Sequence, residues 1–231
     1  MIDGIVFDKD GTLFDFRASW GRWAEMFLAG LARDPAHFAA LADAIGYLPQ
    51  VRSFRPDSVV IAATAADIAA ALLPHLPGRE QAELTEAIDT AAAKVSMAEA
   101  VPLVPLLTAL RARGLRLGVA TNDSEVPARA HLAANGLTQL FDYIAGYDSG
   151  YGPKPGPGMC RAFADTQGLD PARVLMVGDS RHDLEAGRAA GMRTIAVLTG
   201  IATEADLAPH ADVVLPDIGA LPAWLDGLSP R

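Results

Sequence analysis

The sequence is poor in cysteine: Cys160 is the only one among 231 residues, so no disulfide can form within the chain. A chain without disulfides fits the reducing conditions of the cytoplasm, where we expect this protein to work. Cys160 follows a stretch rich in Gly and Pro and opens an expected helix at 160–167. We interpret it as a small packing residue rather than a nucleophile.

Basic residues and long apolar runs are also scarce. The formal net charge is -9 and the sequence pI is near 4.9, so we expect no nucleic-acid binding, which needs a basic surface to neutralise phosphates. No segment approaches the roughly 18 apolar residues of a membrane span, and no secretory signal is expected at the start. A small phosphorylated metabolite stays compatible with this charge, because one divalent cation and a few placed Lys or Arg side chains outweigh a dispersed negative surface locally.

What the sequence does have is a regular alternation of short apolar runs and helical patterns. Each apolar run ends at Gly, Asp, Asn or Thr, as buried strands do where they enter a loop. Helices that end at Gly separate them, which predicts an α/β fold: a three-layer, Rossmann-like core with a parallel sheet covered on both faces. The expected strands are 2–7, 115–120, 143–146, 174–177, 194–198 and 213–215, and the expected helices between them are 104–113, 127–135, 159–167 and 183–190.

The region from 16 to 100 lacks this alternation. It is rich in Ala and Leu and contains no repeated strand pattern. We therefore predict an all-helical cap domain at 16–100, inserted into a core formed by 1–15 and 101–231, with hinges near Asp15 and Val101. The expected helices of the cap are 20–32, 36–45, 63–73 and 81–97.

The densest motif is Asp8-Lys9-Asp10-Gly11-Thr12, directly after the first strand. Two acids spaced by one residue at the end of a strand can face the same crevice, and Gly11 permits a tight turn. Phosphoryl transfer needs a nucleophile, a proton donor for the leaving oxygen and cations that offset phosphate charge. Asp8 can supply the first and Asp10 the second, while for an isolated motif of this kind a solvated acidic turn is an equally good interpretation.

Three later groups of residues complete the pattern. Thr121 and Asn122 end the next strong strand and can donate hydrogen bonds to phosphate oxygens, although alone they are more typical of a helix cap. Lys154 lies between two prolines that stiffen its loop, so its ammonium is held in place, although alone it is more typical of a surface lysine. Asp179 and Asp183 follow a fully apolar strand, and carboxylate oxygens on rigid elements suit Mg²⁺. Asp183 also suits a helix dipole, and we expect a surface or capping role for His182.

Together these motifs resemble the haloacid dehalogenase-like hydrolase superfamily, and more narrowly its phosphoglycolate-phosphatase-like members with a helical cap. The resemblance covers essentially the whole chain and implies a Mg²⁺-dependent phosphatase that acts through an aspartyl-phosphate intermediate. The substrate that it implies is a small-molecule phosphate monoester, either phosphoglycolate-like or a sugar phosphate. It implies that the first strand lies beside the fourth, where open α/β sheets bind ligands. Lys9 is a departure, because relatives usually carry an apolar residue there; it either adds positive charge at the mouth of the site or points away from it. The resemblance implies these roles: catalytic Asp8, Asp10 and Lys154; phosphate-binding Thr121, Asn122 and Lys154; and, for the metal, Asp8, Asp179, the backbone carbonyl of Asp10 and a supporting Asp183.

Other functions stay open on the sequence alone. Asp10 argues against the dehalogenase branch, and the absence of His between 14 and 20 argues against a sugar phosphomutase. A non-enzymatic binding scaffold is disfavoured, because four gathered carboxylates repel one another. The chain is expected to be a monomer or a homodimer. Arginine can clamp a second anionic group of a substrate, so the cap residues to test for substrate contact are Arg17, Trp20, Trp23, Arg52 and Arg55. Taken singly, each is slightly better explained as a solvated surface group, for the arginines, or as packing of the helical core, for the tryptophans.

Overall fold

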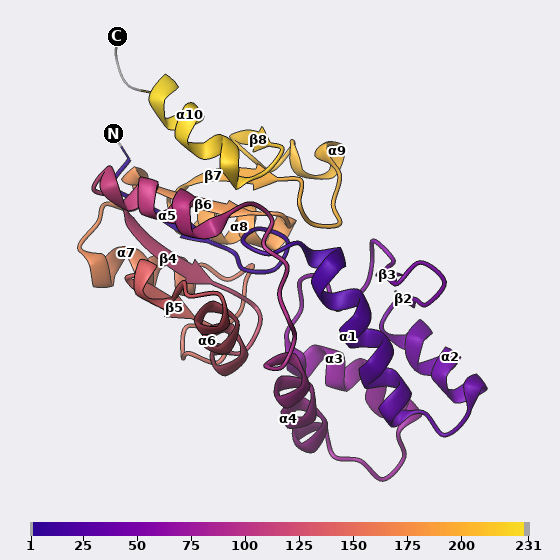
Figure 1. Ribbon diagram of the computed structural model, residues 1–231. Helices are drawn as coiled ribbons and strands as arrows, with labels where there is room; N and C mark the ends of the chain where they lie inside the picture. Colours follow the sequence, from indigo (N-terminus) through magenta and orange to yellow (C-terminus); the bar gives the residue numbers. More distant parts are fainter. Residues whose placement is uncertain (1, 229–231) are drawn as a thin grey trace.

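The structure is a computed structural model that describes residues 2–228, and these residues confirm the α/β class. They form a six-stranded parallel sheet in the order β5-β4-β1-β6-β7-β8 (Figure 1). β1 pairs with β4 on one side and with β6 on the other, so the first core strand lies beside the fourth, as expected. The strands are β1 (Gly4–Phe7), β4 (Arg116–Ala120), β5 (Tyr143–Ala145), β6 (Val174–Gly178), β7 (Arg193–Val197) and β8 (Val213–Leu215).

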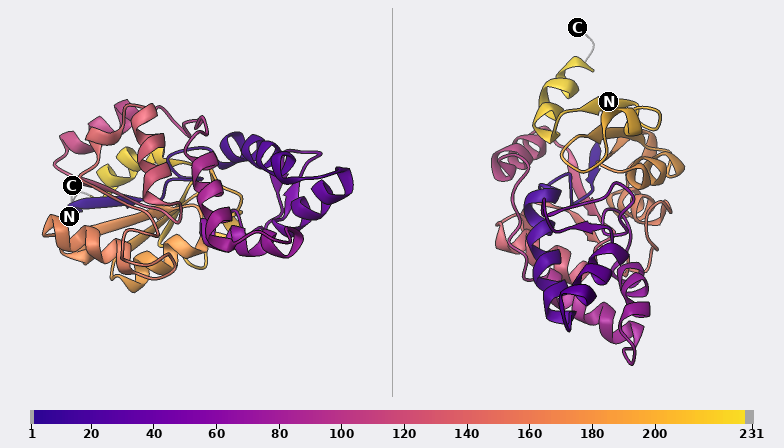
Figure 2. Two further views of the ribbon diagram at one scale, coloured as in Figure 1. Left: turned by 90° about the horizontal axis from the view of Figure 1, so that it is seen from below. Right: turned by 90° about the vertical axis from the view of Figure 1, so that its right-hand side faces the viewer.

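Helices cover both faces of the sheet (Figure 2). Ile5 and Phe7 belong to the hydrophobic cluster that includes side chains of α5, α6 and α10, whereas Val6 packs with α7 and α8 on the opposite face. This follows from the alternation of side chains along a strand, and it explains why β1 and β6 are apolar throughout. The covering helices are α5 (Leu103–Ala112), α6 (Glu125–Ala134), α7 (Gly158–Gln167), α8 (Arg181–Ala189), the short α9 (Glu204–Leu207) and α10 (Leu221–Gly227).

Residues 16–100, called the inserted module from here on, lie against the carboxyl ends of the central strands. Its helices are α1 (Phe16–Leu31), α2 (Pro35–Ala44), α3 (Ala65–Leu72) and α4 (Gln81–Ala92). The prediction of an all-helical module is wrong at one place, because β2 (Tyr47–Leu48) and β3 (Ser53–Phe54) form a short antiparallel pair. The rings of Tyr47 and Phe54 contact each other across this pair, with centroids 5.4 Å apart and planes tilted by 56°, and aromatic cross-strand pairs stabilise such ribbons.

Helix α4 also ends earlier than the pattern predicted, at Ala92 instead of Met97. The carbonyl of Ala92 accepts hydrogen bonds from the Val95 N–H and from Nε2 of His131 in the core. These bonds occupy the carbonyl that a longer helix would use, so the chain turns back toward the core.

The two connections between module and core lie side by side. The N–H of Asp15 donates to the carbonyl of Ala98, and the N–H of Ala100 donates to the carbonyl of Leu13. Asp15 also caps α1, accepting from the Ala18 N–H at 2.8 Å. The division into a core of 1–15 with 101–231 and a cap of 16–100 stays a prediction. The hinges that it predicts, near Asp15 and Val101, lie at these two hydrogen-bonded connections.

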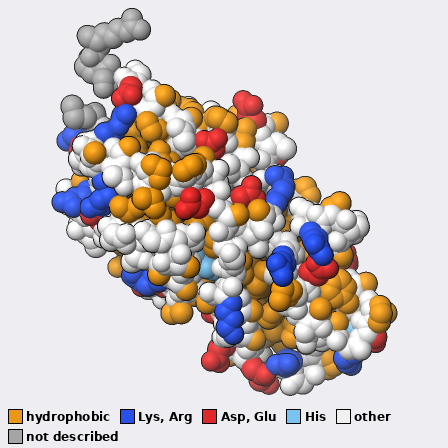
Figure 3. Space-filling model, in the orientation of Figure 1, with side chains coloured by type: hydrophobic (Ala, Val, Ile, Leu, Met, Phe, Trp, Pro, Cys, Tyr) orange, Lys and Arg blue, Asp and Glu red, His pale blue; other side chains and the backbone are white. Residues whose placement is uncertain are grey.

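The visible surface carries charges of both signs (Figure 3). On the face seen in Figure 3, basic and acidic side chains are interspersed over both core and module. Within residues 2–228, no helix is long and apolar enough to cross a membrane. Cys160 is fully buried in α7 against Met176, and burial raises the pKa of its thiol to about 12, which agrees with a packing role.

Candidate active site

Three buried carboxylates meet where β1 and β6 end. Asp8 follows β1, Asp179 follows β6, and Asp183 lies in the first turn of α8; we call these three residues the acid cluster. Each offers one oxygen, and these oxygens lie within 4.8 Å of one another. Gly11, at φ +85°, and Gly200 make room for Asp179, because a Cβ at either position would lie 2.3 Å or 1.7 Å from its Oδ2.

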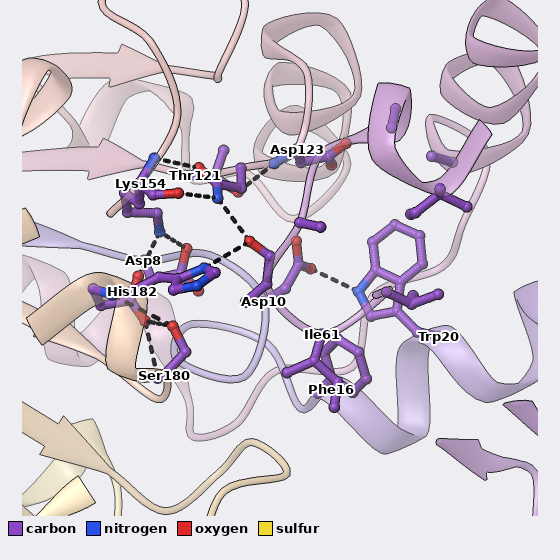
Figure 4. Close-up of a pocket in the computed structure, with 18 of the residues that line it drawn as sticks. Asp8, Asp10, Phe16, Trp20, Ile61, Thr121, Asp123, Lys154, Ser180 and His182 are labelled. Carbon is purple, nitrogen blue, oxygen red and sulfur yellow. Dashed lines mark hydrogen bonds and ion pairs between the residues drawn. The ribbon is translucent and has the colours of Figure 1, made fainter. Parts of the chain in front are cut away.

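Lys154 places its ammonium inside the acid cluster. Its Nζ lies 2.5 Å from Oδ1 of Asp8 and 2.6 Å from Oδ1 of Asp183 (Figure 4). Asn122 holds the Lys154 backbone from both sides: its Oδ1 accepts from the Lys154 N–H at 2.8 Å, and its Nδ2 donates to the Lys154 carbonyl at 2.9 Å. Asn122 therefore positions Lys154, the residue with which it was expected to share phosphate binding.

Burial and charge set the protonation of this group. Burial raises the pKa of Asp8 to about 7, and Lys154 opposes that rise. Burial, together with neighbouring Asp8 and Asp183, raises the pKa of Asp179 well above its ordinary value. Burial alone would lower the pKa of Lys154, but Asp183 and Asp8 raise it, so the ammonium stays protonated. Three carboxylates thus face one ammonium among these four residues.

The donors of the acid cluster suit a hard divalent cation such as Mg²⁺. All of them are oxygens on rigid elements. Asp179 is the least satisfied member, since the hydrogen bond from Oγ1 of Thr12 is 3.5 Å long. A cation at this point would offset the excess negative charge and lower the pKa of each carboxylate. The side chain of Asp10 lies outside this group, so it leaves only its backbone carbonyl for the metal role expected of it.

A second buried ionic group surrounds Lys9. Its Nζ lies 2.7 Å from Oδ2 of Asp10 and 3.1 Å from Oδ2 of Asp123, and it donates to Nδ1 of His131 at 3.0 Å. Burial lowers the pKa of His131 to about 4, with a further contribution from Lys9, so the ring is neutral and its Nε2 donates to the Ala92 carbonyl of the inserted module. Burial raises the pKa of Asp123 to about 6 against the opposing effect of Lys9. Lys9 therefore points inward and ties Asp10 to the core.

The inserted module also contacts Asp10 directly. Nε1 of Trp20, from α1, donates to Oδ1 of Asp10 at 2.8 Å (Figure 4). On the other side of the site, the carbonyl of Ala62 accepts from Nδ2 of Asn122 at 2.7 Å and lies 3.2 Å from Nδ1 of His182. The module thus contacts residues next to the acid cluster on two sides: Asp10 on one, and Asn122 and His182 on the other.

These residues line one pocket between core and module, of ≈ 610 Å³ when its open mouth is counted. Asp8, Asp10, Thr121, Asn122, Lys154 and Asp183 all contribute to its wall. Thr121 is buried, and its Oγ1 accepts from the Asp123 N–H at 3.0 Å, which leaves its hydroxyl hydrogen to donate. Asp179 lies behind this wall, next to Asp8.

The structure separates the expected cap residues. Trp20 and Trp23 line the pocket, whereas Arg17, Arg52 and Arg55 do not. Arg17 is exposed on α1. The guanidinium of Arg52 pairs with Glu25 at 2.8 Å, and that of Arg55 pairs with Asp43 at 2.6 Å.

Sequence reasoning missed several residues of this site. His182 lines the pocket, where a surface or capping role was expected, and the cap of α8 is formed by Ser180 with Asp183. Asp123 directly follows Thr121 and Asn122, so the end of that strand was a signal for it. His131 lies 122 residues from Lys9, and no local pattern connects the two.

Comparison with known proteins places the chain in a family. The family model described as haloacid dehalogenase-like hydrolase matches residues 2–191. The chain belongs to the haloacid dehalogenase-like hydrolases. This family membership agrees with the order of the motifs and with the position of Asp8 at the end of the first strand of the sheet.

Two of the similar sequences are named phosphoglycolate phosphatases. The chain is 40% identical over 120 residues to a phosphoglycolate phosphatase of Rhodospirillum rubrum, a match that covers 52% of this chain and 50% of the relative. It is 30% identical over 224 residues to a phosphoglycolate phosphatase of Yersinia pestis, covering 93% and 89% of the two chains. The chain spans about half the length of the first of these relatives.

Solved structures of the family share the fold. A predicted phosphoglycolate phosphatase from Haemophilus somnus 129pt superimposes with a TM-score of 0.74 at 19% identity, over 97% of this chain and 98% of that chain. A putative β-phosphoglucomutase from Thermotoga maritima superimposes with a TM-score of 0.66 at 16% identity, over 99% and 100%. At such identities the likeness shows the fold alone.

Proposed function

We propose that this haloacid dehalogenase-like hydrolase is a Mg²⁺-dependent phosphatase of small phosphate monoesters that works through an aspartyl-phosphate on Asp8. The observation that carries the proposal is the Asp8 carboxylate itself. It lies in the wall of a pocket, 2.5 Å from the Lys154 ammonium and next to two further carboxylates that can hold a divalent cation. An anionic nucleophile approaches an anionic phosphate only where cations offset both charges.

The residues support the following sequence of steps. A carboxylate oxygen of Asp8 attacks phosphorus, and the bond between phosphorus and the leaving oxygen breaks. Asp10 gives its proton to that oxygen, which leaves as an alcohol. Asp10 then takes a proton from a water molecule, whose oxygen attacks phosphorus and releases inorganic phosphate from Asp8. Trp20 and Lys9 hold the Asp10 carboxyl group in place for both transfers.

Substrate binding falls to the residues around Asp8. Lys154 offsets the charge of the phosphate, and the Thr121 hydroxyl hydrogen is left to donate to a phosphate oxygen. Asn122 holds the Lys154 loop. Mg²⁺, held by Asp8, Asp179 and the Asp10 carbonyl with Asp183 in support, would supply the remaining positive charge. The inserted module forms the apolar side of the pocket, which reduces the contact of the site with bulk water.

The Asp8→Asn variant tests the proposal. With Mg²⁺ present, the parent protein is expected to hydrolyse p-nitrophenyl phosphate, and Asp8→Asn is expected to lose at least 1000-fold in kcat, since an amide is a poor nucleophile; this estimate takes roughly 10³–10⁶-fold as the effect of removing an activated nucleophile. Asp57→Asn, at an exposed acid of the module, is the matched control and is expected to retain parent activity. Parent-like turnover by Asp8→Asn would refute the nucleophile assignment.

A second measurement separates hydrolysis from phosphoryl transfer between positions of one sugar. Release of free phosphate from a sugar phosphate, without an isomerised product, is expected of the phosphatase. Formation of an isomer with no free phosphate would instead identify a phosphomutase.

A further inference from the structure

The two walls of the pocket differ sharply in chemistry. The core contributes four carboxylates together with Lys154, Thr121, Asn122, Ser180 and His182. Every residue that the inserted module contributes is Phe, Trp, Val, Ile or Ala. The bulkiest of these are Phe16, Trp20, Trp23, Ile61, Ile68 and Ile88, and Figure 4 shows Phe16, Trp20 and Ile61 together on the side of the pocket beyond Asp10.

This apolar wall faces the part of the pocket into which a leaving group extends. The phosphate is expected at Asp8 and Lys154, and Asp10, which protonates the leaving oxygen, lies between Asp8 and Trp20 (Figure 4). The atoms bonded to that oxygen therefore continue toward Trp20, Ile61 and Phe16. Apolar walls favour apolar ligand surface, because they return no hydrogen bonds to a polar group.

The cations near the pocket are already occupied. Lys154 binds Asp8 and Asp183, and Lys9 is fully buried among Asp10, Asp123 and His131. The module's Arg52 and Arg55 pair with module carboxylates at the surface, away from the pocket. Among the described residues that line the pocket, His182 is the further basic side chain, and its Nδ1 already lies 3.2 Å from the Ala62 carbonyl.

We propose that the substrate's leaving group is uncharged and mostly apolar, so that the phosphate is its single anionic group. This deepens, and rests on, the proposed phosphatase function. A second phosphate or a carboxylate would lose its hydration against the module wall without gaining a cation. The proposal therefore excludes phosphoglycolate as the preferred substrate, because its carboxylate would lie against that wall. In this respect the chain differs from what the names of its relatives, the phosphoglycolate phosphatases, indicate.

A matched pair of substrates tests this. Benzyl phosphate and 4-carboxybenzyl phosphate react at the same P–O bond, and in both a methylene group separates the ester oxygen from the ring. They differ only by a carboxylate at the far side of the ring. With Mg²⁺, kcat/KM for benzyl phosphate is expected to exceed that for 4-carboxybenzyl phosphate, and that for 2-phosphoglycolate, at least tenfold. Equal values, or a preference for either carboxylated substrate, would overturn the proposal while leaving the phosphatase function intact.

A variant of the module wall tests the cause. Ile61→Arg brings a cation to the wall and is expected to shift the ratio of the two kcat/KM values at least tenfold toward 4-carboxybenzyl phosphate. Ile61→Met, which changes the side chain without adding charge, is the control and is expected to keep the parent ratio. An unchanged ratio in a folded Ile61→Arg protein would contradict the assignment of this wall to the leaving group.

A binding measurement gives a readout that does not depend on turnover. Calorimetric titration of the Mg²⁺-loaded parent protein is expected to give at least tenfold tighter binding of benzylphosphonate than of 4-(phosphonomethyl)benzoate. Tighter binding of the carboxylated compound would overturn the inference even if Ile61→Arg does not fold. Binding with this preference but without hydrolysis of any phosphate ester would sink the proposed phosphatase function and leave the ligand preference standing.

Discussion

Replacing Lys154 by Met removes the ammonium that lies among the buried carboxylates of the acid cluster. In the parent protein its Nζ is 2.5 Å from Asp8 and 2.6 Å from Asp183, and the side chain is buried. Met retains most of the apolar stem, so the change is mainly one of charge. Removing one partner of a buried ion pair costs about 3–5 kcal/mol of free energy of unfolding, because the other charge stays buried and unpaired. We expect a loss of that size at pH 8 without Mg²⁺.

The loss is expected to depend on pH, with a sign that follows from the carboxylates. Lys154 itself keeps its proton in both states up to the ordinary lysine pKa of 10.5, so it contributes no pH dependence below pH 8. Asp8, with its pKa raised from 3.8 to about 7, binds a proton in the folded but not in the unfolded state between these values, so the stability of the folded state falls as pH rises through this window. Without Lys154, which lowers the pKa of Asp8, that fall continues to higher pH, and the gap between parent and variant widens from pH 5.5 to pH 8.

Urea denaturation at pH 5.5 and pH 8, with EDTA and then with excess Mg²⁺, measures this gap. Mg²⁺ at 100 times its Kd stabilises a folded protein by about 2.7 kcal/mol, so it is expected to recover part of the loss at pH 8. Lys94→Met, at an exposed lysine of the module, is the control and is expected to stay within about 0.5 kcal/mol of the parent. A Lys154→Met protein that loses less than about 1 kcal/mol at pH 8, or loses equally at both pH values, would refute the shared-cation reasoning.

Two further variants test the residues that hold Asp10. Trp20→Phe keeps an aromatic ring but removes the N–H that donates to Asp10, and kcat is expected to fall about tenfold, as the loss of a hydrogen bond of about 1.4 kcal/mol predicts. Trp224→Phe, on α10, is the control and is expected to keep the parent kcat; a Trp20→Phe protein as active as this control would contradict the role of Trp20. Lys9→Met leaves Asp10 and Asp123 without their buried cation, so urea denaturation at pH 8 is expected to show a loss of about 3–5 kcal/mol in the free energy of unfolding. A loss no larger than that of Lys94→Met would show that Lys9 does not stabilise the fold.

The sequence predicted the core because its signals are local. Apart from the Lys154 loop, each motif that we singled out ends an apolar run, and a parallel sheet brings the carboxyl ends of its strands to one edge. Asp8 after β1, Thr121 after β4 and Asp179 after β6 therefore lie together, although more than 100 residues separate Asp8 from Thr121. No side-chain contact had to be known for this prediction, only where strands end and which strands are neighbours.

The group around Lys9 was beyond this kind of reasoning. Lys9 lies between two acids of the motif, and a residue between inward-facing neighbours is expected to point away. It does point away from Asp8, but toward α6, where His131 accepts a hydrogen bond from its ammonium and Asp123, just before the helix, pairs with it. Recognising this required the packing of α6 and α4 against the loop after β1, and helix packing at that level is not encoded in any short pattern.

The cap arginines show how topology, not composition, sets the charge of the pocket. The turn between β2 and β3 packs on α1 at Gly21, where a Cβ would lie 2.0 Å from the Arg52 carbonyl, so only Gly permits this approach. With the turn fixed there, Arg52 reaches Glu25 on the outside of α1. After β3 the chain passes along the pocket, where the Ala62 carbonyl accepts a hydrogen bond from Nδ2 of Asn122. This bond places the neighbouring apolar residue, Ile61, in the wall of the pocket. The same hairpin thus turns the arginines outward and lays an uncharged segment over the site, and counting arginines in the sequence could reveal neither.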